Sequence, residues 1–166
     1  SVSQDEASKF LLNGIGFDYI EIDPFGSPNQ FLDAACKRLA RDGILAVTAT
    51  DTGALAGSFP DACRRKYWAE PLRNEMMHEI GMRILIRKVQ LIGMQYDKAL
   101  IPVFGHASDH YTRIYLHSEK SKSAIKTIIS QHGFVRYCNH CGEHTSSGVN
   151  VERCSCGTIM RVAGPL

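Results

Sequence analysis

The pattern of hydrophobic and polar positions changes period twice within the first fifty residues. Residues 17–22 are rich in aromatic and β-branched side chains, which favours a short strand. Residues 29–41 place apolar side chains near helical spacing, and residues 44–50 form an almost continuous apolar run, typical of a strand covered on both faces. A strand, a helix and a second strand in this order predict a right-handed parallel crossover.

After residue 50, the pattern of hydrophobic and polar positions predicts a loop, two helices and two further strands. Residues 51–60 predict a loop, and apolar positions from Pro71 onwards predict a long amphipathic helix interrupted near Gly81. Residues 99–104 and 111–116 are both strand-like, and the short connection between them predicts antiparallel pairing. Another helix is expected over 123–132, and after Phe134 the chain becomes rich in glycine, cysteine and polar residues.

Composition narrows the class of protein. The chain has 166 residues, of which 44% are hydrophobic and 22% charged, which excludes a disordered or collagen-like chain. Its apolar runs fall short of the roughly 20 residues that a membrane-spanning helix needs, so we expect no membrane partner. The polar, acidic first ten residues do not resemble a signal peptide, so the cytoplasm is the expected location.

Charge is distributed unevenly along the chain. Residues 1–63 hold nine acidic and four basic residues, whereas residues 64–166 hold fifteen basic and eight acidic ones. Basic residues interleaved with aromatics suit contacts to phosphates and bases, and they occur at Arg64, Arg65, Lys66, Tyr67 and Trp68, with Arg73 beyond. A solvated helix face with internal ion pairs explains the same residues equally well.

Four of the six cysteines crowd the last 29 residues, as Cys138-x2-Cys141 and Cys154-x-Cys156. Without a secretion signal, this spacing favours a metal site over disulfides. Four thiolates suit tetrahedral Zn²⁺ in a closed structural site. Free thiols, a disulfide or an iron–sulfur cluster remain alternatives.

The turn after the first expected strand carries the most specific chemistry. In open α/β sheets, chemistry lies beyond the carboxyl ends of the strands, where Asp23, Pro24 and Phe25 stand. A carboxylate and a backbone carbonyl can accept the two N–H groups of an exocyclic amine and direct its lone pair at an electrophile, while an aromatic ring stacks on the base. An ordinary helix-entry turn is the alternative, because Asp before Pro is common there.

The sequence FDYIEIDPFGSP at 17–28 closely resembles the signature of the tRNA guanine-26 N2-dimethyltransferase family. The likeness continues in the family's order through residues 43–51, 63–67, 78–85 and 109–113, and it covers most of residues 5–136. The terminal cysteines also resemble the zinc site of many members.

The resemblance implies a class I, Rossmann-like methyltransferase fold that uses S-adenosylmethionine to methylate N2 of a guanine in tRNA. Asp23 matches the catalytic carboxylate, and Pro24 and Phe25 match the residues that hold the base. Asp5, Glu6 and Ala7 match the segment that contacts the adenosine part of the cofactor. The tRNA-contacting residues are then expected at Arg64, Arg65, Lys66, Arg73, Tyr111 and Arg113.

The glycine-rich loop that holds the methionine part of the cofactor in this family has no match in the chain. We therefore expect residues 1–133 to form a partial catalytic domain with an antiparallel final strand pair, whose partner is a missing N-terminal part, and residues 134–166 to form a zinc-binding segment. Two other functions fit some of the same residues: amino-methylation of adenine or cytosine, and a zinc-containing RNA-binding module without catalysis.

Overall fold

The computed structural model describes residues 2, 4–146 and 152–166. None of the helices in this part of the chain is long and apolar enough to cross a membrane. The elements, in chain order, are α1 (Ala7–Asn13), β1 (Phe17–Ile22), α2 (Asn29–Arg38), β2 (Leu39–Ala49), α3 (Thr52–Leu55), α4 (Pro60–Tyr67), α5 (Met77–Met94), β3 (Ala99–Ala107), β4 (Thr112–Glu119), α6 (Lys122–Gln131), β5 (Val135–Tyr137), β6 (His144–Thr145) and β7 (Arg161–Ala163).

Four strands form the main sheet, in the order β1-β2-β4-β3. β1 pairs with β2 in parallel, with α2 as the connection, so the expected crossover is confirmed. β4 pairs antiparallel with both β2 and β3, which confirms the expected antiparallel pair. The fold is thus a mixed α/β sheet in which β1 lies at one edge.

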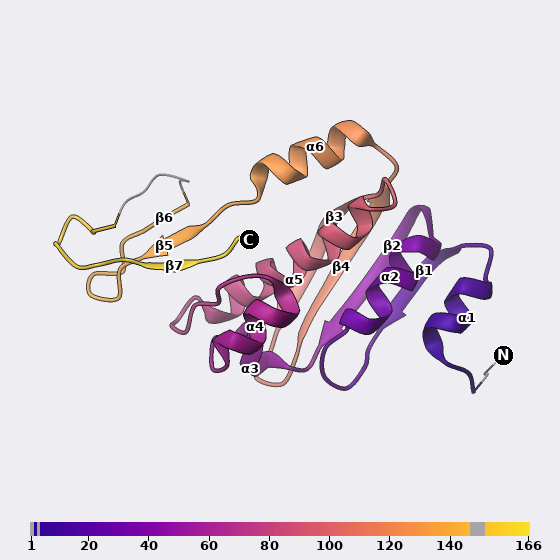
Figure 1. Cartoon of the computed structure of the whole chain (residues 1–166), viewed down its shortest axis with the longest axis horizontal. Coiled ribbons are helices and arrows are strands. Elements are labelled where there is room, and N and C mark those ends of the chain that lie inside the picture. Colours follow the sequence, from indigo (N-terminus) through magenta and orange to yellow (C-terminus); the bar gives the residue numbers. More distant parts are fainter. Residues whose placement is uncertain (1, 3, 147–151) are drawn as a thin grey trace.

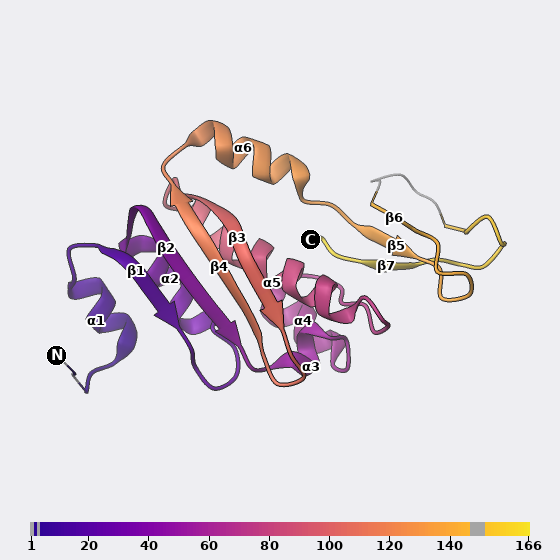
Figure 2. The ribbon, with the colours of Figure 1, turned by 180° about the vertical axis from the view of Figure 1, so that it is seen from behind.

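Helices cover one face of this sheet. Figure 1 shows α2 and α5 in front of the strands, and the view from behind in Figure 2 shows β1, β2, β4 and β3 with no helix across them. The alternation of β4 explains this, because Ile114 and Leu116 are completely buried under the helices while Arg113 and Tyr115, on the opposite face, are partly exposed. The core therefore lies between the sheet and its single helical layer.

The C-terminal segment forms a second, three-stranded sheet in the order β6-β5-β7. Figure 1 shows it projecting away from the main sheet beyond α6. Tyr137 and Ala163 nevertheless belong to the main hydrophobic cluster, and Glu70 exchanges two backbone hydrogen bonds with Gly164. This segment is therefore attached to the region that follows α4.

The helix expected over 29–41 is three residues too long. α2 ends at Arg38, and β2 begins at Leu39. The Lys98 ammonium donates to the carbonyl oxygens of Cys36, Lys37 and Leu39, at 2.6, 3.1 and 2.6 Å. A cation at a helix C-terminus satisfies carbonyls that have no partner within the helix, so the chain can turn into the strand at this point.

Three other expectations along the chain are wrong in detail. Residues 51–60 include the short helix α3. The long helix begins at Met77, after a turn in which the Asn74 side chain accepts a hydrogen bond from the Met76 N–H at 2.9 Å. α5 passes Gly81 without a break, and a Cβ at this position would lie 3.1 Å from Leu55 of α3. Glycine at this position permits close helix packing and does not interrupt the helix.

We predict that Leu116→Ala lowers the free energy of unfolding by about 2–5 kcal/mol, because Leu116 is fully buried in the middle of the sheet and its loss leaves a cavity. Urea unfolding measures the change. Leu12→Ala, which removes the same group from an exposed position in α1, should cost less than about 1 kcal/mol. Equal losses in the two variants would show that β4 is not the centre of the core.

Candidate active site and metal centre

The turn between β1 and α2 is fixed to the end of β2. The Gly26 N–H donates to Thr50 Oγ1 at 2.6 Å, and the Thr50 N–H donates back to the Gly26 carbonyl at 3.0 Å. Gly26 has φ +85°, a backbone conformation that residues other than glycine rarely adopt. These bonds hold the turn rigidly while the ring of Phe25 extends into solvent, 103% exposed.

Asp23 lies at the start of this turn on the sheet face that has no helices. Its carboxylate is half exposed and lies 3.8 Å from the guanidinium of Arg113. Arg113 also binds Glu21, which accepts a hydrogen bond from the Tyr19 hydroxyl at 3.0 Å. The hydrogen bond from Arg113 holds the pKa of Glu21 below its ordinary value, so the positive charge beside Asp23 is shared between two carboxylates.

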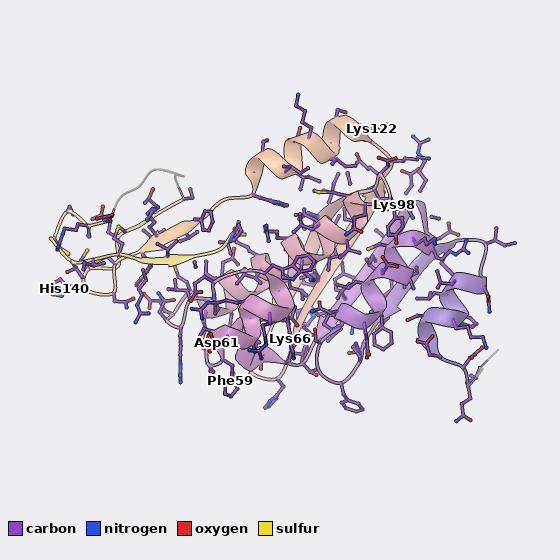
Figure 3. All side chains as sticks on the ribbon, in the orientation of Figure 1. Phe59, Asp61, Lys66, Lys98, Lys122 and His140 are labelled. Carbon is purple, nitrogen blue, oxygen red and sulfur yellow. The ribbon has the colours of Figure 1, made fainter. Side chains whose placement is uncertain are left out.

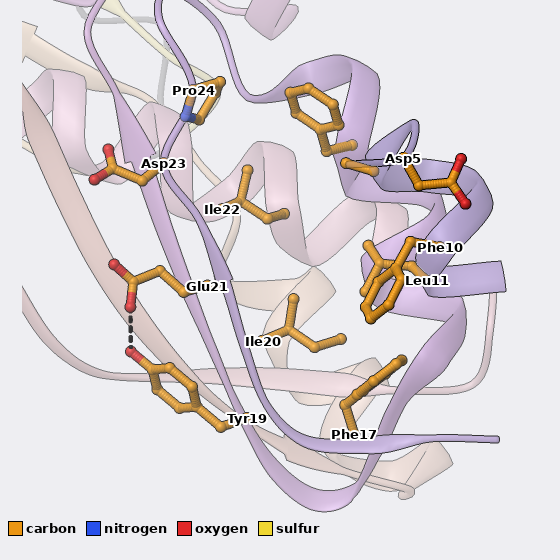
Figure 4. Close-up of a pocket in the computed structure, with 12 residues that line it drawn as sticks. Asp5, Phe10, Leu11, Phe17, Tyr19, Ile20, Glu21, Ile22, Asp23 and Pro24 are labelled. Carbon is orange, nitrogen blue, oxygen red and sulfur yellow. Dashed lines mark hydrogen bonds between the residues drawn. The ribbon is translucent and has the colours of Figure 1, made fainter. Parts of the chain in front are cut away.

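A cavity of about 490 Å³ follows the outer edge of β1, between this strand and α1. Asp5 and Ala7 line it from the side of α1, and Asp23 and Pro24 line it from the side of β1. Figure 4 shows the apolar wall, where Phe10, Leu11 and Phe17 lie opposite Ile20 and Ile22, while Glu21 and Asp23 turn away from α1. An apolar wall with a few polar groups is typical of a small-molecule site.

The segment expected to contact the adenosine part of the cofactor is only partly at this cavity. Asp5 and Ala7 line it. Glu6 does not line it and instead caps α1, where its carboxylate accepts from the backbone N–H groups of Ser8 and Lys9 at 2.9 and 2.7 Å. These bonds hold the pKa of Glu6 below its ordinary value.

The basic stretch forms the last turn of α4, and Figure 3 labels Asp61 and Lys66 on this helix and Phe59 just before it. Arg64 pairs with both Asp61 and Glu70, at 2.5 and 2.6 Å, so its charge is satisfied within the chain. Lys66 pairs with Asp51 at 3.0 Å. Arg65 and Arg73 are exposed and make no ion pair within the described residues, which leaves these two most open to an external anion.

Tyr111 lies in the connection before β4, and Arg113 lies in β4 itself. The Tyr111 ring packs edge-on against His106, with centroids 5.3 Å apart, and Arg113 lies over the ring of Tyr115. Both residues therefore take part in a group of ring contacts, and Arg113 also reaches Asp23 at 3.8 Å.

One group of residues near the turn was not expected from the sequence. Tyr67 is fully buried, and its hydroxyl lies 2.5 Å from Asp51 Oδ1 and 3.2 Å from Ser27 Oγ. Tyr67 stood out only as an aromatic residue within a basic stretch. Its partners Asp51 and Ser27 lie 16 and 40 positions away in the chain, so no local pattern reveals this arrangement.

The four C-terminal cysteines converge, and their sulfur atoms all lie within 4.8 Å of one another. Cys138 and Cys156 are 3.6 Å apart, and Cys141 and Cys154 are 3.3 Å apart. A tetrahedral Zn²⁺ with bonds of about 2.3 Å separates its thiolates by about 3.8 Å, so this donor set fits zinc. Hydrogen bonds with Thr158 lower the pKa of Cys156 to about 6, whereas the hydrogen bond to Glu143 raises the pKa of Cys154.

Comparison with known proteins gives relatives along the whole chain. The tRNA (guanine(26)-N(2)/guanine(27)-N(2))-dimethyltransferase of Aquifex aeolicus is 41% identical over 97% of this chain and 43% of its own length. The tRNA (guanine(26)-N(2))-dimethyltransferase of Methanothermobacter thermautotrophicus is 40% identical over 99% of this chain and 45% of its own length. The chain therefore spans less than half the length of these relatives.

A solved structure agrees with the fold. The complex of Trm1 from Pyrococcus horikoshii with S-adenosyl-L-methionine superposes with a TM-score of 0.88 at 32% identity, covering 99% of this chain and 43% of that one. The expected α/β methyltransferase fold is confirmed by this likeness. Because the model of the family described as N2,N2-dimethylguanosine tRNA methyltransferase also matches residues 1–166, this chain belongs to that family.

Proposed function

We propose that the protein to which this chain belongs transfers methyl groups from S-adenosylmethionine to N2 of guanine 26 in tRNA. The observation that carries this proposal is the cavity along β1, which Asp23 and Pro24 of the turn line together with Asp5 and Ala7. The relatives' names supply the substrate, and the turn supplies the chemistry. We also propose the cytoplasm as its location, where a tRNA substrate would be met.

Asp23 is the proposed catalytic residue. Its half-exposed carboxylate accepts one N–H of the guanine amine, and the backbone carbonyl beside Pro24 accepts the other, so the nitrogen lone pair faces the methyl donor. Phe25 stacks on the base from the exposed end of the turn. The hydrogen bonds between Gly26 and Thr50 hold these groups in place before the base arrives.

S-adenosylmethionine supplies an activated methyl group when it is bound. The residues present fit its adenosine part, because the cavity joins an apolar wall, from Phe10 and Leu11, to a carboxylate at Asp5. Asp5 and Ala7 would hold the adenosine, while Glu6 would fix the helix that carries them. We assign the methionine part to residues outside this chain.

The remainder of the catalytic domain is the proposed partner of residues 1–133. The relatives are more than twice as long as this chain, and β1 is an edge strand of the sheet that residues 17–119 form. On the face without helices, Tyr19 and Phe104 are 51% and 61% exposed. A sheet of this kind is normally covered on both faces, so the missing part would add strands beside β1 and helices over this face.

Residues 134–166 form the proposed zinc-binding segment. Zn²⁺ would be structural, because four cysteine ligands leave no open position for a substrate. The Cys154 thiol donates to Glu143 at 2.9 Å, and Cys138 and Cys154 are buried together with Met160. The metal would replace the core that this short segment lacks.

We predict that Asp23→Ala in the full-length protein lowers methyl transfer by about 10²–10⁴-fold, because the amine loses the carboxylate that orients it. Mass spectrometry of nucleosides from tRNA incubated with S-adenosylmethionine measures the product. Asp18→Ala, on the same strand, should retain activity. Unchanged N2-methylation in Asp23→Ala would refute the proposed mechanism, and tRNA binding without any methylation by the unaltered protein would favour an RNA-binding module.

We predict that Arg65→Ala weakens tRNA binding and lowers the slope of log Kd against log salt by about one, because one phosphate contact is lost. Filter binding over a range of salt concentrations gives the slope. Arg41→Ala removes an equally exposed arginine from the start of β2 and should leave the slope unchanged. The same decrease in both variants would mean that only net charge matters and that α4 is not a tRNA contact.

We predict one zinc ion per chain by elemental analysis, and we expect a chelator to remove it and to lower the thermal stability of the segment. Cys141→Ser should reduce the zinc content substantially, whereas Cys36→Ala, which alters a cysteine outside the cluster, should retain it. A zinc content that does not respond to Cys141→Ser would contradict this ligand set.

A further inference from the structure

A continuous row of hydrogen bonds connects the catalytic turn to the basic helix. The Asn29 N–H lies 3.4 Å from Ser27 Oγ, Ser27 Oγ lies 3.2 Å from the Tyr67 hydroxyl, and that hydroxyl lies 2.5 Å from Asp51. Asp51 also accepts from Lys66 at 3.0 Å. The row begins in the turn that carries Asp23 and ends at a lysine on the exposed face of α4.

The direction of these bonds follows from the number of protons. A phenol has a single hydrogen, and the short contact to a carboxylate assigns it to Asp51. The Ser27 hydroxyl must then donate to Tyr67, and it accepts from the Asn29 N–H. Burial and Asp51 both raise the pKa of Tyr67, so the phenol keeps its proton and the row keeps one direction.

The row has a second connection to the same turn. Thr50, next to Asp51 in the chain, binds Gly26 through both its side chain and its backbone. The end of β2 therefore holds the turn at two points, directly at Gly26 and through Tyr67 at Ser27. The Asn29 side chain adds a third connection, because it donates to the Lys66 carbonyl at 2.8 Å.

We propose that Tyr67 and Asp51 are positioning residues for methyl transfer, which fix the Asp23–Pro24–Phe25 turn through Ser27 and link its geometry to α4. The proposal rests on the function proposed above. Tyr67 is completely buried, 14% of the Asp51 side chain is exposed, and neither residue lines the cavity along β1, so both act through the turn and not on the substrate.

The alternative role for Tyr67 is packing alone, and the two roles predict different kinetics. A purely structural hydroxyl would affect stability and leave the rate of the bound complex unchanged. A positioning hydroxyl sets the orientation of the amine acceptors, and a displacement of about 1 Å at a reacting centre costs about 100-fold in rate. The measured quantity is therefore the single-turnover rate at saturating tRNA and S-adenosylmethionine.

The experiment uses full-length Tyr67→Phe, which keeps the buried ring and removes only the hydroxyl. We expect a single-turnover rate about 10- to 100-fold below that of the unaltered protein, with a tRNA Kd within about twofold. Tyr96→Phe is the matched control, because the Tyr96 hydroxyl donates to Asp33 at 2.6 Å, away from the turn. It removes an equivalent tyrosine–aspartate bond and should leave the rate unchanged.

Ser27→Ala tests the same link from the side of the turn and opens no cavity in the core, so it answers the question even if Tyr67→Phe does not fold. A folded Ser27→Ala or Tyr67→Phe variant with the rate of the control would overturn the proposal. If those variants match the control while Asp23→Ala is inactive, only this proposal fails. If Asp23→Ala is fully active, the proposed role of Asp23 fails with it, and if the unaltered protein methylates no tRNA, the proposed function fails.

Discussion

The parallel pairing of β1 with β2 is the constraint on which the site depends. Its register places Ile22 opposite Val47, so the two strands end at the same edge of the sheet within a few residues of each other. Asp23 follows one strand, and Thr50 and Asp51 follow the other. Only because these ends are adjacent can Thr50 bind Gly26 and Asp51 receive the Tyr67 hydroxyl. A register shift of one residue would turn Ile20 and Ile22 out of the core, so burial of these two side chains also specifies the site.

Successive side chains of β1 point to opposite faces of the sheet, so one set packs in the core and the other lies at the candidate site. Ile20 and Ile22 face the helical layer, while Tyr19, Glu21 and Asp23 face the side without helices, where Arg113 reaches them from β4 across β2. Arg113 remains a predicted tRNA contact, and within the chain it binds Glu21 and lies close to Asp23. A guanidinium in this position offsets the repulsion between two carboxylates on one strand and keeps them available on a face that the rest of the domain would cover.

Elements whose pattern is local were predictable from the sequence, and features that depend on distant residues were not. The four strands of the main sheet, the crossover and the cysteine cluster follow from hydrophobic period and spacing, whereas β5, β6 and β7 were not predicted. The end of α2 at Arg38 depends on Lys98, about sixty residues later, and the need for glycine at position 81 depends on the closeness of Leu55. The basic stretch shows the same limit within the candidate site. Its arginines cannot be distinguished in the sequence. Only the fold shows that Arg64 forms ion pairs with Asp61 and Glu70 while Arg65 forms none within the described residues.

Helix α4 explains how neighbouring residues in this stretch can serve both substrate binding and catalytic geometry. Successive residues of a helix point about 100° apart, so Tyr67 is buried against the turn while Arg65 and Lys66 remain at the surface. Lys66 and Tyr67 meet again at Asp51, whose two oxygens each accept from one of them. A phosphate that draws Lys66 outward would remove charge from the same carboxylate that anchors Tyr67. In the proposed function, binding of the tRNA backbone at Lys66 and the position of the Asp23 turn would thus be connected through one aspartate, Asp51.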